Sequence, residues 1–226
     1  MCTVARRHAN RFRIGRVIAR PFTGPNGNFT RTSRRHDFSM KPPRTILDAI
    51  SENGRTVIGI GKISDIFAGQ GITESLPTDS NAKGMRRILE NWARFENGLI
   101  FANLVDFDML YGHRRDLPGY ARVLAEFDEW LGEFISSVLP ADLVLITADH
   151  GNDPTYRGTD HTREQVPLFV LHNHEARALG IRKTYADIAA TLGDYLQVPG
   201  GWPVGESFLS EGDSSRDETQ ALRASN

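Results

Sequence analysis

The sequence contains few of the features that mark secreted, membrane-spanning or nucleic-acid-binding proteins. Its single cysteine, Cys2, cannot form an internal disulfide, which suits a reducing cytoplasm. No apolar run approaches the ~20 residues that a membrane helix needs, and no apolar segment follows the basic first residues, as it would in a secretory signal. A net charge of −1 gives no overall attraction to nucleic acid or to an anionic membrane. We therefore expect a cytoplasmic protein with neither of these partners.

The composition is that of a globular protein of moderate size. Hydrophobic residues make up 39% of the 226 residues and charged residues 24%, close to the average for folded domains. A chain of this length can form one medium domain, or one domain with a small appendage.

From residue 45 onward the pattern alternates between short apolar runs and amphipathic stretches. The apolar runs predict strands and the amphipathic stretches predict helices; the strands are expected at 55–62, 99–105, 143–147 and 166–171, and the helices at 45–52, 81–95, 118–139 and 184–196. This alternation predicts an α/β fold, with a mainly parallel sheet and helices on both of its faces.

The two ends of the chain differ from this middle part. Residues 12–22 mix polar and apolar residues in near alternation, which predicts a half-buried strand. The turn cluster Gly24-Pro-Asn-Gly-Asn follows, and Lys41-Pro-Pro-Arg is a hinge. Residues 211–226 belong to a polar stretch that predicts a disordered tail. We expect a small N-terminal domain over 1–40, the α/β core over 41–210 and the tail over 211–226.

Acidic and imidazole side chains cluster where the predicted strands end. Asp149 and His150 follow the strand at 143–147, with Asp160 and His161 in the next loop; Asp106, Asp108 and His113 follow the strand at 99–105. The carboxyl ends of parallel strands meet at one crevice. Mixed carboxylate and imidazole donors favour Mn²⁺ or Zn²⁺ over Mg²⁺ or Ca²⁺. Any one of these residues alone could be a polar loop residue, but together they predict a metal site, where two ions could clamp a phosphoryl group.

Positive side chains could supply the other half of a phosphate site. Lys62 follows a predicted strand, and the N-terminal region contains Arg13, Arg16, Arg20, Arg31, Arg34 and Arg35. Guanidinium groups match phosphate oxygens bidentately. The composition alone leaves a solvated basic face equally open.

Several longer runs resemble the phosphopentomutases of the alkaline phosphatase superfamily. They are Gly15-Arg-Val-Ile-Ala-Arg-Pro-Phe22, Gly27-Asn-Phe-Thr-Arg-Thr32, Gly59-Ile-Gly-Lys-Ile-Ser-Asp-Ile66, Asn103-Leu-Val-Asp-Phe-Asp-Met-Leu-Tyr-Gly-His-Arg-Arg-Asp116, Asp149-His-Gly-Asn-Asp-Pro154 and Gly158-Thr-Asp-His-Thr-Arg-Glu-Gln-Val-Pro167. The likeness extends from about Gly15 to Leu209. The Asp-His-Gly element is common to the superfamily, whereas the Thr-Asp-His-Thr-Arg-Glu element is more specific.

The resemblance implies an alkaline phosphatase-like core with part of a small α+β cap domain at the N-terminus. It also implies a dinuclear site, usually of Mn²⁺, that moves phosphate between C1 and C5 of ribose or deoxyribose. The roles that it implies are one metal on Asp108, His113 and His161, the other on Asp149 and His150, and a sugar phosphate held by Lys62, Arg16 and Arg31. Asp106 and Asp160 would support these ligands.

Two expected parts of the family's site have no match in this sequence: a first strand ending in an aspartate ligand, and the threonine that carries the transferred phosphate. We therefore expect one well-formed metal site and little activity from this chain alone. Two alternatives stay open. One is another phosphohydrolase or phosphoglycerate-mutase-like enzyme of the superfamily, and the other is a non-catalytic metal-binding remnant.

Overall fold

The computed structural model describes residues 1–32, 34–173, 176–200 and 203–209, and these form two compact units. The first unit combines Met1–Pro77 with Glu96–Ala102, and the second combines Thr78–Phe95 with Asn103–Asn226. Residues 1–40 share a unit with residues that follow them, so the predicted boundary after residue 40 stays a prediction. The predicted tail, 211–226, lies outside the described residues.

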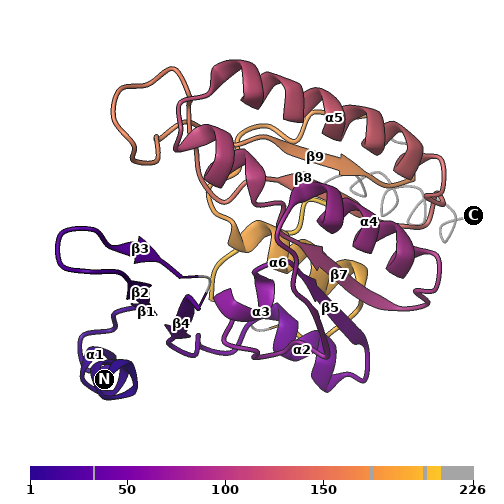
Figure 1. The fold of residues 1–226 in the computed structure, drawn as a ribbon. Helices are drawn as coiled ribbons and strands as arrows, with labels where there is room; N and C mark the ends of the chain where they lie inside the picture. Colours follow the sequence, from indigo (N-terminus) through magenta and orange to yellow (C-terminus); the bar gives the residue numbers. More distant parts are fainter. Residues whose placement is uncertain (33, 174–175, 201–202, 210–226) are drawn as a thin grey trace, which may run out of the picture. The chain divides into compact units, whose positions relative to one another are not determined.

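The first unit begins with a helix and two small antiparallel ribbons (Figure 1). These elements are α1 (Cys2–Asn10), β1 (Arg16–Ala19) paired with β4 (His36–Ser39), and β2 (Phe22–Thr23) paired with β3 (Thr30–Arg31). The guanidinium of Arg6 anchors α1 by donating to the carbonyls of Ile14 and Phe38, on either side of the β1–β4 ribbon. The alternating pattern of the N-terminal region therefore forms short strands, as predicted.

A three-stranded parallel sheet forms the centre of the first unit. Its order is β6-β5-β7, and its elements and nearby helices are β5 (Thr56–Ile60), β6 (Glu74–Leu76), β7 (Gly98–Ala102), α2 (Ile46–Glu52) and α3 (Ile63–Ile66). Val57 and Ile60 on the central strand are fully buried. Thr45 caps α2, and its backbone N–H donates to the Asp48 carboxylate at 2.7 Å, which completes a capping box. The parallel sheet and its helices confirm the α/β class.

The second unit contains the longest helices and a separate strand pair. Its elements are α4 (Asn81–Trp92), the π-helix η1 (Phe107–Gly112), α5 (Leu117–Ile135), β8 (Val144–Thr147), β9 (Leu168–Leu171) and α6 (Ala186–Tyr195). No described helix is long and apolar enough to cross a membrane.

One fold prediction was wrong: β8 does not join a parallel sheet among the described residues. It pairs antiparallel with β9 in a two-stranded ribbon, with Val144 opposite Leu171 (Figure 1). Parallel strands need a long crossover, usually a helix. The segment between β8 and β9 contains no helix, and its two arms approach each other at an antiparallel bridge between Gly151 and Thr162. The chain therefore returns as an extended hairpin that carries three of the predicted metal ligands, Asp149, His150 and His161.

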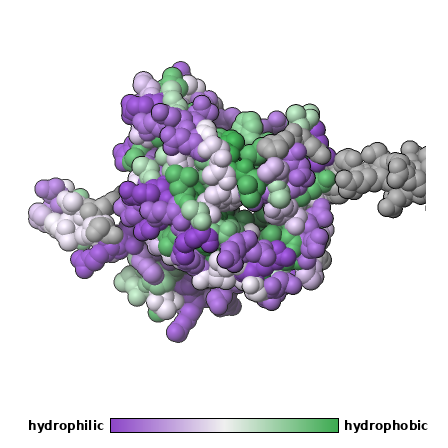
Figure 2. All heavy atoms as spheres, turned by 90° about the vertical axis from the view of Figure 1, so that its right-hand side faces the viewer, coloured by the Kyte–Doolittle hydropathy of each residue, from purple (hydrophilic) through white to green (hydrophobic). Residues whose placement is uncertain are grey.

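The helix packing also differs from the predicted stripe on α5. Helical spacing in the sequence predicts an apolar stripe of Leu124, Phe127, Leu131 and Ile135. Two of these, Leu124 and Ile135, are 47% and 41% exposed. The packed side instead contains Phe134, whose ring stacks on that of Trp130 at 5.3 Å and meets Trp92 of α4 edge-on at 5.2 Å. Because α5 is apolar on more than one side, periodicity alone could not choose between its faces. Figure 2 accordingly shows hydrophobic groups at the surface between hydrophilic ones.

Candidate metal centre

The π-helix η1 determines how Asp108 and His113 lie relative to each other. Residues five apart in an α-helix point about 140° away from one another. Here the N–H of His113 donates to the carbonyl of Asp108 at 2.9 Å, closing the wider i→i+5 turn of a π-helix. The wider turn brings both side chains toward the same side. Insertions of this type are frequent at functional sites.

Asp108, His113 and His161 present three donor atoms at nearly equal separations. The Nε2 of His113 lies 3.4 Å from Asp108 Oδ1, the Nε2 of His161 lies 3.3 Å from the same oxygen, and the two Nε2 atoms are 3.2 Å apart. Ligands bound about 2.1 Å from a tetrahedral ion lie about 3.4 Å from one another. These atoms therefore have the spacing of three ligands to one metal ion.

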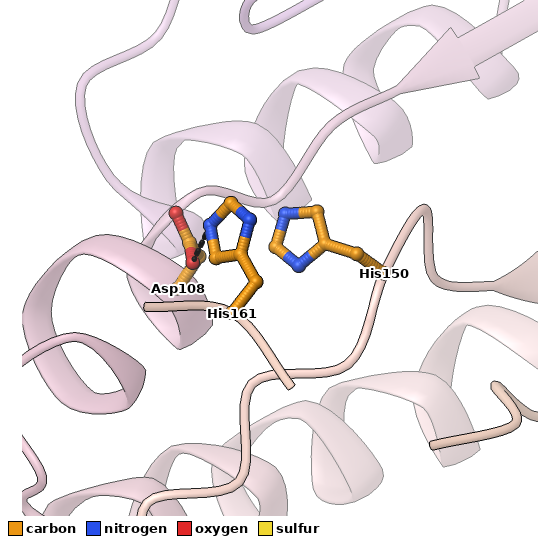
Figure 3. A group of neighbouring side chains, drawn as sticks. All are labelled: Asp108, His150 and His161. Carbon is orange, nitrogen blue, oxygen red and sulfur yellow. Dashed lines mark ion pairs between the residues drawn. The ribbon is translucent and has the colours of Figure 1, made fainter. Parts of the chain in front are cut away.

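Asp149 and His150 lie next to this group. The imidazole of His150 stacks on that of His161 with ring centroids 3.6 Å apart, and one donor atom each from Asp108, His150 and His161 lie within 4.8 Å of one another (Figure 3). The Nε2 of His150 is also 3.6 Å from a carboxylate oxygen of Asp149, whose side chain is 74% exposed. The fold thus gathers all the predicted metal ligands in one place.

Backbone carbonyls hold two of the imidazoles with Nε2 available for a ligand. The Nδ1 of His113 lies 2.6 Å from the carbonyl of Thr159, and the Nδ1 of His150 lies 3.1 Å from the carbonyl of Gly151. A proton on Nδ1 donates to each carbonyl and leaves Nε2 with its lone pair, which is the form that binds metals. Asp160 was expected to orient an imidazole, but the adjacent Thr159 carbonyl does so for His113.

Asp106, also expected to support the ligands, stabilises the start of α4. Its buried carboxylate accepts a 2.7 Å hydrogen bond from the backbone N–H of Asn81, and its own N–H donates to the Asn81 side chain at 2.8 Å. This reciprocal pair ties the segment before η1 to α4. It explains the acidic residue at position 106 without a metal.

Asn152 is a component of the site that the sequence analysis did not single out. It is buried, and its Nδ2 donates to Asp108 Oδ1 at 2.6 Å. Gly112 allows this approach, because a Cβ there would lie 2.5 Å from Asn152 Nδ2. Asn152 stands within the quoted Asp-His-Gly-Asn run, but a side-chain amide is a weaker metal signal than a carboxylate or an imidazole.

The surroundings of Asp108 are acidic. Burial raises the pKa of Tyr120, and the negative charges of Asp108 and Glu164 raise it further. Negative charge beside the imidazoles favours a cation over an anion at this position. The negative charge near Asp108 is therefore consistent with donor atoms that suit a cation.

The residues predicted to bind the sugar phosphate belong to the first unit. Lys62 caps α3 directly after β5, and Arg16 on β1 lies 3.5 Å from Asp37. The side chain of Arg31, on β3, lies outside the described part of the structure. The part of these residues in substrate binding stays a prediction.

Comparison with known proteins identifies the family. A model of the metalloenzyme superfamily matches residues 55–199. The phosphopentomutase of Symbiobacterium thermophilum is 54% identical over 203 residues, covering 88% of this chain and 51% of that protein. The phosphopentomutase of Caldanaerobacter subterraneus subsp. tengcongensis is 52% identical over 219 residues, covering 93% and 54%. The chain thus spans about half the length of the curated relatives it matches.

A solved structure supports the fold. The phosphoglycerate mutase of Leishmania mexicana superposes with a TM-score of 0.55 at 18% identity, covering 71% of this chain and 38% of that one. At this identity the likeness bears on the fold alone, which is the α/β fold of alkaline phosphatase-like enzymes. The family match and the high identities show that the chain belongs to the metalloenzyme superfamily and is a homologue of the phosphopentomutases.

Proposed function

We propose that this chain carries metal-binding and phosphate-binding parts of a phosphopentomutase-type enzyme, which interconverts the 1-phosphate and 5-phosphate of ribose or deoxyribose. The observation that carries the proposal is the spacing of Asp108 Oδ1, His113 Nε2 and His161 Nε2, at 3.2–3.4 Å from one another. Homology to phosphopentomutases supports the substrate class. The cytoplasm is the proposed location, on the basis of the single cysteine.

The donor set fits a divalent transition metal. Asp108, His113 and His161 would hold one ion, and Asp149 with His150 would contribute to a second. Mixed carboxylate oxygen and imidazole nitrogen donors fit Mn²⁺ or Zn²⁺, and the resemblance to phosphopentomutases makes Mn²⁺ the proposed metal. When bound, such ions would polarise phosphate oxygens and neutralise their charge.

The chain's own groups would hold and orient the substrate. Lys62 and Arg16 offer positive charge, and Arg31 is proposed to act with them. Arginine binds phosphate oxygens through two parallel N–H groups, which fixes orientation as well as charge. Transfer of a phosphoryl group depends mainly on such positioning and on electrostatic stabilisation.

We expect this chain by itself to turn over little or no ribose 1-phosphate. The resemblance implies a threonine nucleophile and a further aspartate ligand, and neither could be assigned in this sequence. A coupled assay with ribose 1-phosphate and Mn²⁺ measures the activity. Turnover comparable to that of a complete phosphopentomutase would show that a residue of this chain replaces the threonine.

Metal titration of the full chain, followed by metal analysis after gel filtration, tests the site. We expect saturation at about one Mn²⁺ per chain, held by three protein ligands, and loss of binding in His161→Ala. The matched control is His8→Ala, an exposed histidine on α1. Equal binding by all three proteins would refute the metal role, and two tightly bound ions would show that the second site is also complete.

Substitution of an arginine in the basic N-terminal region tests the substrate class. Arg16→Ala should weaken binding of ribose 5-phosphate about 10-fold, the effect of a charge-assisted hydrogen bond. Arg44→Ala, an exposed arginine paired with Glu52, is the control in the same unit. Unchanged affinity in Arg16→Ala, alongside intact metal binding, would favour a general phosphohydrolase or a metal-binding remnant instead.

A further inference from the structure

Arg115 makes an unusual number of hydrogen bonds for a side chain that is not a candidate ligand. It follows His113 by two residues and is half-buried. Its guanidinium donates to one side-chain oxygen and to four backbone carbonyls: Asn152 Oδ1 at 2.9 Å, Asp153 O at 2.7 Å, Asp160 O at 2.7 Å, Gly112 O at 3.2 Å and Gly158 O.

Four of these five acceptors lie in the loop between two candidate metal ligands, and the fifth, Gly112, ends η1. Asn152 and Asp153 come directly after His150 and Gly151, while Gly158 and Asp160 come just before His161. The planar guanidinium therefore joins the two arms of the loop from inside. A backbone bridge between Gly151 and Thr162 closes the base of the same loop.

Two of these contacts lead on to the donor atoms. Asn152 accepts from Arg115 through Oδ1, so its Nδ2 must face Asp108 Oδ1, to which it donates at 2.6 Å. The carbonyls of Gly158 and Asp160 flank Thr159, whose own carbonyl lies 2.6 Å from His113 Nδ1. Arg115 therefore helps to position Asp108 through Asn152, and His113 through the backbone at residues 158–160.

We propose that Arg115 is the positioning residue of the metal centre: it locks the 151–160 loop so that Asp108, His113 and His161 are arranged for a metal before one binds. This rests on the proposed metal-binding function. Arg115 contacts no candidate ligand side chain directly and acts through Asn152 and the Thr159 segment.

The backbone of Arg115 allows its side chain to be tested separately from its turn. Its φ is +56°, in the left-handed region that glycine adopts with less strain. If the residue only shaped the turn, Arg115→Gly would serve as well or better. If the guanidinium holds the loop in place, Arg115→Gly removes its hydrogen bonds. The loop should then loosen, even though glycine relieves the strain of the turn.

Lysine cannot replace this arginine. Its ammonium is a compact group with three donors, whereas the guanidinium spreads five N–H groups in a plane. The acceptors of Arg115 lie on three separate segments, around Gly112, Asp153 and Asp160. Arg115→Lys should therefore restore little of what Arg115→Gly loses.

The first measurement is titration of the full chain with Co²⁺, whose visible absorption reports ligand geometry. Arg115→Gly and Arg115→Lys should bind Co²⁺ about 10- to 100-fold more weakly, the usual effect of removing a residue that supports metal ligands. Arg114→Ala, at the neighbouring exposed arginine, should bind as the unaltered chain does. Unaltered Co²⁺ affinity and spectrum in Arg115→Gly would overturn the proposal.

Amide hydrogen exchange without metal is the second measurement. Arg115→Gly should exchange faster at residues 151–162 while α4 and β5 keep their protection, and Arg114→Ala should not change. Absence of Co²⁺ binding by the unaltered chain would refute the metal function but leave the loop lock to be decided by exchange. Unchanged exchange in Arg115→Gly would refute the lock itself.

Discussion

The side-chain amide of Asn152 donates to the carboxylate of Asp108 at 2.6 Å, across 44 residues of sequence. Asn152 Oδ1 accepts from Arg115, so the amide cannot turn without placing its NH₂ group against the guanidinium. A carboxylate held in this way has one orientation and keeps a second lone pair for a metal. The hydrogen bond between Asn152 and Asp108 therefore links η1 to the loop that contains His150 and His161.

Removing this amide should cost both stability and metal affinity. Asn152→Ala removes one hydrogen bond from the half-buried Asp108 carboxylate and one from the Arg115 guanidinium, which costs about 1–3 kcal/mol in the free energy of unfolding. Metal affinity should fall about 10- to 100-fold. Urea denaturation and Mn²⁺ titration measure the two effects. Asn26→Ala, in an exposed turn, is the control and should leave both unchanged.

A methyl group at Gly112 should displace the same amide. The Cβ of Gly112→Ala would lie 2.5 Å from Asn152 Nδ2 and 2.7 Å from its Cγ, so stability should fall by about 1–3 kcal/mol. Gly132→Ala on α5 meets nothing within 4 Å and should instead stabilise by about 0.5–1 kcal/mol. Thermal and urea unfolding compare the two. Equal effects from both substitutions would contradict the close approach.

Metal should stabilise the folded chain, and chelation should reverse this. Mn²⁺ at about 100 times its dissociation constant adds about 2.7 kcal/mol, because it binds the folded state alone. Mg²⁺ at equal concentration should add less, since imidazole nitrogen suits Mn²⁺ better. The midpoint of thermal unfolding with and without EDTA is the measurement. Asp108→Asn should abolish the Mn²⁺ shift, and a full shift in that variant would exclude the carboxylate as a ligand.

Asp48 should make the first unit sensitive to acid. Burial raises the pKa of Asp48, but hydrogen bonds from the Thr45 backbone, the Gln70 side chain and the Thr45 hydroxyl outweigh it and hold the pKa below its ordinary value. A lowered folded-state pKa stabilises the fold above the unfolded pKa of about 3.9 and loses that contribution as pH falls through the folded value. Asp48→Asn should therefore destabilise at pH 7 and approach the unaltered chain in acid.

Urea unfolding at pH 7 and at about pH 3 makes this comparison. Asp79→Asn is the control, because Asp79 is 81% exposed and its ion pair with Lys83 lies at the surface, where such pairs contribute little. A difference between Asp48→Asn and the unaltered chain that is the same at both pH values would show that the charge of Asp48 is not involved.

Local pattern was sufficient to predict several of the helices and strands and to mark the candidate ligands. Thr45 followed by Asp48 marks the start of α2, and the apolar run before Lys62 marks β5, because capping and burial depend on neighbours in sequence. The candidate ligands stood out because carboxylates and imidazoles cluster directly after two predicted strands. Those ligands lie together, although only their strand-end positions and the family resemblance had suggested it.

Only the tertiary structure shows how β8 pairs, which face of α5 is packed and which residues support the candidate metal ligands. The antiparallel pairing of β8 with β9 depends on how the intervening loop returns, and the packed face of α5 depends on which neighbour covers it. Arg115 bonds mainly to backbone carbonyls, which every residue has, so no side-chain pattern could reveal its partners. The sequence by itself determined which atoms could bind a metal. The folded chain determined which groups hold those atoms 3.2–3.4 Å apart, because such contacts join segments distant in sequence.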